Sequence, residues 1–277
     1  MPLTVVAVNA HPDDEAILMG GTLARLSVAG HRVVLVTATD GDAGDASAVY
    51  AAGGLGTRRW RELRASAMAL GAVEVIDLGY GDSGLGPTDL QPSPDRPRLH
   101  TVAVDDAAAR LAQILSDQQA DIVIGYDAAG GYGHRDHVQI HHVVRRAVDM
   151  LREVHAVRLF EATAPREPVL RVIGLLGRLR LLSGFDPAEW ADGFTPSGQI
   201  THRVDVRSQI HAKRAALNAH ASQHSTDGGT RTMTLALRAP TAIFRLILGR
   251  EYFVEPARAT TLPDGVDAFA DIVVTAA

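Results

Sequence analysis

The chain has 277 residues, of which 46% are hydrophobic and 21% are charged, and its formal net charge at pH 7 is -5. A chain of this size and composition buries a core as one large domain or as a domain with an appendage. The negative charge gives no indication of nucleic acid or an anionic membrane as a partner. Because the chain has no Cys, disulfides, thiolate zinc sites and cysteine nucleophiles are excluded.

No segment predicts export or insertion into a membrane. The first residues lack the basic, apolar and small-residue order of a signal peptide. The longest apolar stretch, Val169 to Leu182, is interrupted by three Arg and is too short to span a bilayer. We therefore expect a cytoplasmic protein without a transmembrane segment. The stretch predicts a helix packed on the core, with a lid or a membrane-surface helix as alternatives.

Strand-like and helix-like segments alternate along the first 160 residues. This alternation predicts βαβ units with right-handed crossovers and an α/β fold: a Rossmann-like, doubly wound, mostly parallel sheet with helices on both faces. No G-x-G-x-x-G follows the first strand, so a dinucleotide is not expected. The expected strands are residues 3–8, 33–39, 73–78, 121–124 and 156–160, and the expected helices are residues 15–29, 57–70, 104–117 and 137–152.

The second half of the chain predicts a smaller C-terminal elaboration. Residues 201–206 favour a short strand, residues 208–220 a helix, and residues 232–249 a helical region broken by Pro240. We expect residues 1–164 to form the α/β catalytic core with the metal site. Residues 165–277 should complete the substrate pocket without forming an independent domain.

The segment His11-Pro12-Asp13-Asp14-Glu15 directly follows the first expected strand. Open α/β sheets bind ligands at the carboxyl ends of their strands, where this turn should lie. Carboxylates in a first helical turn also favour the helix dipole, which explains Glu15 and one Asp but not the adjacent His and second Asp. Imidazole and carboxylate groups suit Zn²⁺ or a similar divalent ion, and the remaining Asp could act on a metal-bound water.

A second group of polar residues, Gly133-His134-Arg135-Asp136-His137, follows the fourth strand and opens a helix. The loops at residues 40–56, 79–98 and 125–136 should gather with it around the first turn. His137 and His141 have the i, i+4 spacing of a metal site, but no Glu lies between them to act as base. The alternative interpretation is that His141 and His142 lie on the helix surface or between helices. For Asp136, the alternative is a helix N-cap.

Together the two segments resemble the signature motifs of the PIG-L/LmbE-like zinc deacetylases, a family that includes mycothiol-pathway and antibiotic-pathway enzymes. The resemblance covers about the first 150 residues, with Arg135 in place of the usual Pro, and a weaker similarity extends to the segment Lys213 to Gln223. It implies one Zn²⁺ per chain, with another divalent ion possible. It implies that zinc is bound by His11, Asp14 and His137, that Asp13 is the general base, and that His134, oriented by Asp136, stabilises the oxyanion.

The chemistry of these residue types agrees with the resemblance. Two His and one carboxylate leave zinc an open position for water, and protonated His134 would stabilise negative charge on the substrate. The family implies a small-molecule glucosaminide substrate, whose N-acetyl amide is cleaved to a free amine and acetate, with a longer N-acyl amide as an alternative. An inositol aglycone would indicate a mycothiol-type role, and a bulky or acylated aglycone a glycopeptide antibiotic pathway.

Arg59, Asp82 and Ser83 are candidate substrate contacts. Arg59 could instead pair with Glu62 on its own helix face, and Asp82 and Ser83 could only shape a turn. The family resemblance also places His220 and Gln223 near the site.

Three other functions stay open on the sequence alone. One is amide hydrolysis of the mycothiol S-conjugate amidase type, and another is a non-catalytic sugar-binding protein of the same fold. The third is phosphoester hydrolysis, which commonly uses two metals. A binding protein has no need of a spare carboxylate, which favours an enzyme.

Overall fold

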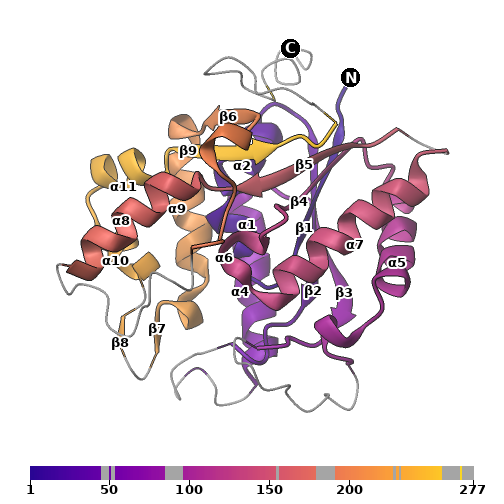
Figure 1. The fold of residues 1–277 in the computed structure, drawn as a ribbon, viewed down its shortest axis with the longest axis horizontal. Helices are drawn as coiled ribbons and strands as arrows, with labels where there is room; N and C mark the ends of the chain where they lie inside the picture. Colours follow the sequence, from indigo (N-terminus) through magenta and orange to yellow (C-terminus); the bar gives the residue numbers. More distant parts are fainter. Residues whose placement is uncertain are drawn as a thin grey trace.

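A seven-stranded sheet runs through the described part of the computed structural model, in the order β3-β2-β1-β4-β5-β9-β6 (Figure 1). The structure describes residues 1–44, 50, 54–84, 96–153, 156–178, 191–226, 229–230, 232–257 and 269. The strands are β1 (Thr4–Asn9), β2 (Arg32–Thr39), β3 (Glu74–Tyr80), β4 (Ile122–Tyr126), β5 (Arg158–Thr163), β6 (His202–Asp205) and β9 (Arg250–Val254).

The first five strands are parallel, which confirms the predicted fold class. Val5 of β1 pairs with Val33 of β2 on one side and with Ile122 of β4 on the other. β9 was not predicted and is antiparallel to both β5 and β6. Because β6 and β9 extend the same sheet, the C-terminal part is hydrogen-bonded to the core through the pairing of β9 with β5. The boundary at residue 164 stays a prediction.

Helices cover both faces of this sheet (Figure 1). Alternate residues of β1 point into two separate cores, Val5 and Ala7 into one and Val6 and Val8 into the other. The first core packs under α2 (Gly20–Val28), α4 (Leu55–Leu70) and α9 (Ile210–Ala219), and the second under α5 (Val104–Asp117) and α7 (Arg135–Leu151). Strands buried on both faces explain the nearly continuous apolar runs in the sequence.

The remaining elements are short or lie toward the C-terminus. The helices are α1 (Asp14–Ile17), α6 (Gly130–Gly133), α8 (Arg166–Arg178), α10 (Thr232–Arg238) and α11 (Thr241–Leu248). Single 3₁₀ turns occur at η1 (Leu99–Thr101), η3 (Ser197–Gln199), η4 (Arg207–Gln209) and η5 (Ala221–Gln223), and β7 (Ser225–Thr226) pairs with β8 (Gly229–Thr230).

The helix predicted over residues 15–29 is split into α1 and α2. The cause is a tertiary contact that the local sequence does not reveal. Glu251 on β9 accepts hydrogen bonds from the backbone N–H of Gly21, at 2.8 Å, and of Thr22, at 2.7 Å. These are the unsatisfied donors of a new helix start, so Glu251 stabilises a second N-terminus at Gly20.

The apolar, Arg-containing segment Val169 to Leu182 forms a helix only in part. α8 ends at Arg178, and residues 179–190 lie outside the described residues. Val172 and Leu175 are 56% and 57% exposed, so the prediction that this face packs on the core is wrong for these two side chains. None of the helices in the described ranges is long and apolar enough to cross a membrane.

The chain reverses its direction of winding between β1 and β4. From β1 it proceeds outward through β2 to β3, and it then returns to place β4 on the opposite side of β1. In open α/β sheets, the crevice at the carboxyl ends of two such strands is the usual ligand site. The segments after β1 and β4 are the two signature motifs, so the fold brings them to one place.

We expect Lys213→Met to destabilise the fold strongly. Lys213 on α9 donates to Glu251 at 2.6 Å, and both side chains are 1% exposed. Removing one partner of a buried pair leaves an uncompensated charge, which typically costs ~3–5 kcal/mol. Urea unfolding measures the loss. As a control, Arg146→Met breaks an exposed pair with Asp105 and should change the free energy of unfolding by less than ~1 kcal/mol. Equal effects of the two substitutions would contradict this assignment.

Candidate active site

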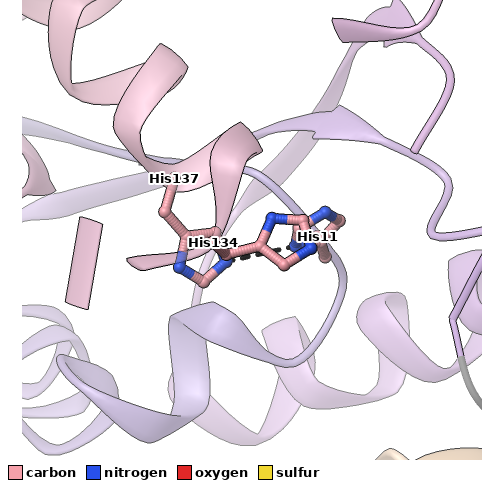
Figure 2. A group of neighbouring side chains, drawn as sticks. All are labelled: His11, His134 and His137. Atoms are coloured by element: carbon pink, nitrogen blue, oxygen red, sulfur yellow. Dashed lines mark hydrogen bonds between the residues drawn. The ribbon is translucent and has the colours of Figure 1, made fainter. Parts of the chain in front are cut away.

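The turn after β1 and the loop before α7 meet at the reversal point of the sheet, and they bring three histidines together (Figure 2). His11, His134 and His137 are 6%, 6% and 2% exposed. The loop reaches this position through Gly130, whose φ is +62° and where a Cβ would lie 2.7 Å from the backbone nitrogen of Val138. A side chain at this position would therefore displace the start of α7.

Three atoms from His11, Asp14 and His137 form a nearly equilateral triangle. His11 Nδ1 lies 3.2 Å from His137 Nε2, and Asp14 Oδ2 lies 3.4 Å from the first nitrogen and 3.3 Å from the second. Donors bound tetrahedrally to zinc at about 2.0–2.1 Å are separated by about 3.3 Å. The spacing therefore fits three ligands of one tetrahedral ion.

The hydrogen bonds of the two imidazoles leave the correct nitrogens facing this position. His11 Nε2 lies 3.2 Å from Asp136 Oδ2 and 3.3 Å from Asp82 Oδ1, so it carries a proton toward these carboxylates. His137 Nδ1 lies 3.1 Å from the carbonyl of Gly130 and donates to it. Nδ1 of His11 and Nε2 of His137 are thus the two nitrogens that face this position and would bind a cation once it displaces any proton between them.

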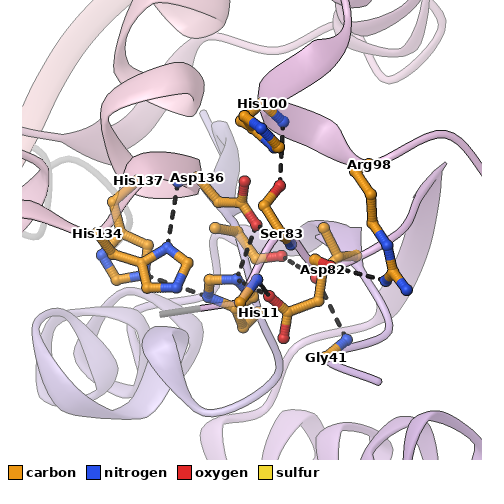
Figure 3. A network of polar contacts seen from close by, with 12 residues as sticks. His11, Gly41, Asp82, Ser83, Arg98, His100, His134, Asp136 and His137 are labelled. Carbon is orange, nitrogen blue, oxygen red and sulfur yellow. Dashed lines mark hydrogen bonds and ion pairs between the residues drawn. The ribbon is translucent and has the colours of Figure 1, made fainter. Parts of the chain in front are cut away.

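The charges around His11 also fit a cation (Figure 3). Burial on its own would lower the pKa of His11, but the neighbouring Asp82, Asp136 and Asp14 outweigh it and raise this pKa well above its usual value. Burial likewise opposes ionisation of Asp14, but His137 and His11 hold the pKa of that carboxyl well below its usual range. Several buried carboxylates around two imidazoles make this a possible metal site.

Asp13 precedes Asp14 in the chain and lines the same cavity as His11 and Asp14. Arg59 donates to Asp13 Oδ1 at 3.2 Å, to the carbonyl of Pro12 at 2.5 Å and to the carbonyl of Gly41 at 3.0 Å. Gly41 has φ +66°, a conformation that favours glycine, and a Cβ there would lie 2.3 Å from the guanidinium, so that Arg59 would have to move. Burial raises the pKa of Asp13, and Arg59 only partly opposes this effect.

His134, rather than Asp136, is the N-cap of α7, which corrects the sequence prediction. The Nδ1 of His134 accepts a hydrogen bond from the backbone N–H of Asp136 at 3.1 Å. Its Nε2 is therefore the donor nitrogen of a neutral ring. Burial, followed by the nearby His11 and His137, lowers the pKa of His134 to about 4. This lowered pKa favours a neutral His134 at neutral pH, whereas the sequence analysis expected the protonated form.

Asp136 directs its carboxylate to His11 and not to His134. Its Oδ2 accepts from the backbone N–H of Ser83 at 2.9 Å and contacts His11 Nε2. Asp136 thus orients His134 through its amide and His11 through its side chain. These contacts join the ends of β1, β3 and β4 (Figure 3).

The three candidate substrate contacts occupy different positions. Arg59 and Asp82 line the cavity, whereas Ser83 is fully buried and its Oγ accepts from the backbone N–H of His100 at 3.1 Å. The alternative pairing of Arg59 with Glu62 is wrong, because Glu62 accepts from the N–H and Oγ of Ser222. The alternative that Asp82 only shapes a turn is incomplete. Asp82 accepts from the N–H of Gly84 and also contacts His11.

The cavity over these residues has a volume of about 170 Å³. Gln223 reaches it from the C-terminal part, and Tyr132 reaches it from the loop before α7. His141 does not reach the cavity, since its Nδ1 lies 3.0 Å from the carbonyl of Tyr126, and His142 is exposed on α7. The alternative in which His137 and His141 share a metal is therefore wrong.

Sequence reasoning missed Tyr126, the last residue of β4. Its hydroxyl donates to Asp14 Oδ2 at 2.6 Å and accepts from the backbone N–H of Ala10 at 2.8 Å. Its ring stacks on His137 with 4.3 Å between centroids. A polar aromatic at the carboxyl end of a strand that neighbours β1 was the available signal. Tyr126 thus supports two of the three groups in the triangle.

Comparison with known proteins agrees with this geometry. Residues 6–148 match the PIG-L family, described as GlcNAc-PI de-N-acetylase. The chain is 38% identical over 243 residues to the 1D-myo-inositol 2-acetamido-2-deoxy-alpha-D-glucopyranoside deacetylase of Acidothermus cellulolyticus, a match that covers 82% of each protein. A second deacetylase of the same name, from Nocardiopsis dassonvillei, is 38% identical over 80% of this chain and 84% of that protein.

Among solved structures, the N,N'-diacetylchitobiose deacetylase of Pyrococcus horikoshii has the same fold. It aligns with a TM-score of 0.60 and 22% identity over 97% of this chain and 88% of that one. At this identity the likeness shows the fold alone. The extent of the family match and the identity to two curated deacetylases show that this chain belongs to the PIG-L family of deacetylases.

Proposed function

We propose that this protein hydrolyses the N-acetyl amide of an N-acetylglucosamine-containing small molecule, giving acetate and a free amine. One Zn²⁺ would be held by His11, Asp14 and His137. The observation that carries the proposal is the triangle of donor atoms, 3.2–3.4 Å on each side, with the carboxylate of Asp13 beside it. The membership of the family and the names of the two relatives support the reaction.

Zinc is the metal that this donor set favours. Two imidazole nitrogens and one carboxylate oxygen, with no thiolate in the chain, leave a fourth tetrahedral position open, as catalytic zinc sites require. When bound, zinc lowers the pKa of a water and polarises the amide carbonyl. Another divalent ion could occupy the same ligands, so metal analysis of the purified protein is part of the test.

Asp13 would be the general base. Its carboxylate lines the cavity and lies next to the triangle, and its raised pKa suits a group that accepts a proton from the attacking water. The same carboxyl group can then pass that proton to the departing amine. The hydrogen bond from Arg59 keeps the acceptor in place without fully neutralising it.

His134 would stabilise the carbonyl oxygen as it gains negative charge. Its Nδ1 is occupied by the amide of Asp136, so a neutral ring carries its proton on Nε2, and His134 is one of the residues that line the cavity. A donor placed in advance acts without a change of protonation, and loss of one such donor typically costs ~10²–10³ in rate.

The cavity favours a neutral, hydroxyl-rich substrate. Among its described lining residues the only guanidinium is that of Arg59, which is occupied by two backbone carbonyls and Asp13. Asp13, Asp14 and Asp82 make this surface acidic, which would repel a phosphate. We therefore propose a glucosaminide with an inositol-like aglycone, the chemistry named for the two relatives. The part of the chain after residue 164 would help to bind this substrate through Gln223. We propose that the enzyme is cytoplasmic.

A two-metal phosphoesterase is disfavoured by the second acidic group at the site. His11 Nε2, Asp82 and Asp136 lie close enough to hold an ion, but they share His11 with the first triangle. One imidazole would then have to give up both protons to bridge two cations. The proton between His11 and the carboxylates is better explained as the one that orients a metal-binding ring.

The substrate proposal predicts an order of activities. The zinc-loaded protein should release free amine from N-acetylglucosaminyl-inositol with a kcat/KM at least ~10-fold above that for N-acetylglucosaminyl-phosphatidylinositol, because like charges placed together are costly. Diacetylchitobiose serves as a neutral comparison, and a fluorogenic amine reagent measures the product. Preference for the phosphate-bearing compound would overturn the neutral-substrate proposal, and absence of amine from all three would overturn deacetylation.

The roles of the metal ligands and the base can be separated by substitution. Asp13→Ala should keep one zinc per chain and lose ~10²–10⁴ in kcat, because it removes only the proton acceptor. His11→Ala should lose zinc as well as activity. Elemental analysis and amine release measure the two properties, with the exposed Asp105→Ala as the matched control. Near-normal turnover by Asp13→Ala would show that Asp13 is not the base.

Tyr126→Phe should weaken zinc binding while leaving the fold intact. The substitution removes the O–H donor to Asp14 Oδ2 but keeps the ring stacked on His137. Loss of a hydrogen bond to a metal ligand typically costs ~10–100-fold in affinity. Competition with a chromogenic chelator measures the zinc Kd. An unchanged Kd would mean that Tyr126 contributes to packing alone.

A further inference from the structure

The backbone of Asp13 has φ 112° and ψ -27°. Residues with a Cβ rarely adopt positive φ, and Asp13 is one of three described non-glycine residues that do so. Such conformations persist only where the surrounding structure holds them, and they concentrate at functional sites. The contacts that hold Asp13 therefore bear on how its carboxylate is placed.

Asp13 is held from two sides. On the cavity side, Arg59 donates to its carboxylate and to the carbonyl of Pro12. On the opposite side, the backbone N–H of Asp13 donates to Glu15 Oε2 at 3.0 Å. The second contact acts on the backbone itself, which is where the unusual conformation lies.

Glu15 is fixed by two side chains that are distant from it in the sequence. Its Oε1 accepts from Ser66 Oγ on α4 at 2.5 Å and lies 2.7 Å from Nε2 of His220, the residue directly after α9. Glu15 and Ser66 are 0% exposed and His220 is 2% exposed. Among the described residues, the other ring nitrogen of His220 is buried and has no hydrogen-bond partner. The contact with Glu15 is the hydrogen bond of this ring within the same part of the chain.

A purely structural role does not explain this arrangement. A carboxylate in a first helical turn usually favours the helix dipole from the surface, but α1 has only four residues and Glu15 is fully buried. Burying a carboxylate is costly unless it is paired and hydrogen-bonded. Apolar residues in place of such a buried pair often make the fold equally stable. What apolar residues cannot do is accept the N–H of Asp13.

We propose that Glu15, held by Ser66 and His220, is the positioning residue for the general base, because it fixes the backbone of Asp13 so that the carboxylate faces the cavity. The inference rests on the proposed function and deepens it. It assigns to His220, which is not among the residues lining the cavity, an effect on the reaction that passes through Glu15.

Substitution of the two donors tests the proposal. His220→Ala should lower kcat by ~10–100-fold while KM and the zinc Kd stay at their wild-type values, since neither substrate contacts nor metal ligands are removed. His220→Gln, whose amide can still donate to Glu15, should recover most of the loss. Ser66→Ala removes the other donor and should act in the same direction. Amine release and chelator competition provide the three quantities.

Glu251→Gln is the matched control. Glu251 is also a buried carboxylate that accepts two backbone N–H groups and a side-chain donor, but it lies at the start of α2 and not at Asp13. The Glu251→Gln substitution should lower the melting temperature without changing kcat. If His220→Ala fails to fold, Ser66→Ala carries the same test.

Three results would overturn the inference. One is an unchanged kcat in both His220→Ala and Ser66→Ala, and another is a zinc Kd that weakens in parallel with kcat, which would assign Glu15 to the metal ligands. The third does not depend on turnover. In crystal structures of the two variants, φ of Asp13 should leave the positive region or its carboxylate should turn from the cavity, and an unchanged Asp13 in both would contradict the proposal. This readout still decides the inference if the wild-type protein releases no amine and the proposed function fails.

Discussion

Buried negative charge at the carboxyl ends of the central strands is the constraint on which the rest of this structure depends. Asp14, Asp82 and Asp136 all approach the ring of His11, and each is less than a tenth exposed. Carboxylates removed from water are costly unless hydrogen bonds and opposite charge compensate them. Each of the three therefore accepts a backbone N–H: Asp14 from His11, Asp82 from Gly84 and Asp136 from Ser83. These N–H donors do not fully compensate the negative charge of the three carboxylates. The remaining charge surrounds the position between His11 and His137, where a divalent cation fits.

The parallel sheet makes this convergence possible, because it delivers the ends of three strands to one edge. β1 supplies the turn with His11, β4 supplies Tyr126 and the loop to His137, and the segment after β3 supplies Asp82 and Ser83. The fold does not specify the chemistry, since unrelated reactions occur on one fold. The specific reaction depends on the side chains, and above all on which nitrogen of each imidazole is left without a proton.

The sequence predicted those features that depend on local pattern. The apolar runs of β1, β2 and β4 are nearly continuous because both faces of these strands are buried. The two His- and Asp-rich segments follow β1 and β4. It failed where a tertiary contact overrides a local preference. The alternating pattern of a half-buried strand would place the charged side chain of Glu251 toward solvent. In β9, Glu251 is buried instead, because Lys213 and the start of α2 donate hydrogen bonds to it.

The same reason accounts for two errors at the site. A helix N-cap favours Asp over His, yet the carboxylate of Asp136 is drawn to His11 and Ser83, so His134 caps α7 instead. An i, i+3 pair on a helix is worth only a few tenths of a kcal/mol. Arg59 gains more from the buried carbonyls of Pro12 and Gly41, which come from other loops. No pattern within α4 contains that information.

Two adjacent carboxyl groups, Asp13 and Asp14, have opposite pKa shifts, which suits the two different roles proposed for them. Burial would raise the pKa of Asp14, but His137 and His11 outweigh it and hold this pKa well below the usual range, so the carboxyl group would stay ionised as the proposed ligand. Asp13 points to the cavity, where burial outweighs Arg59 and raises its pKa. Environments that separate the pKa values of neighbouring groups indicate different roles for them. The proposed base, Asp13, is the residue with the positive φ, and the proposed ligand, Asp14, is the first residue of α1.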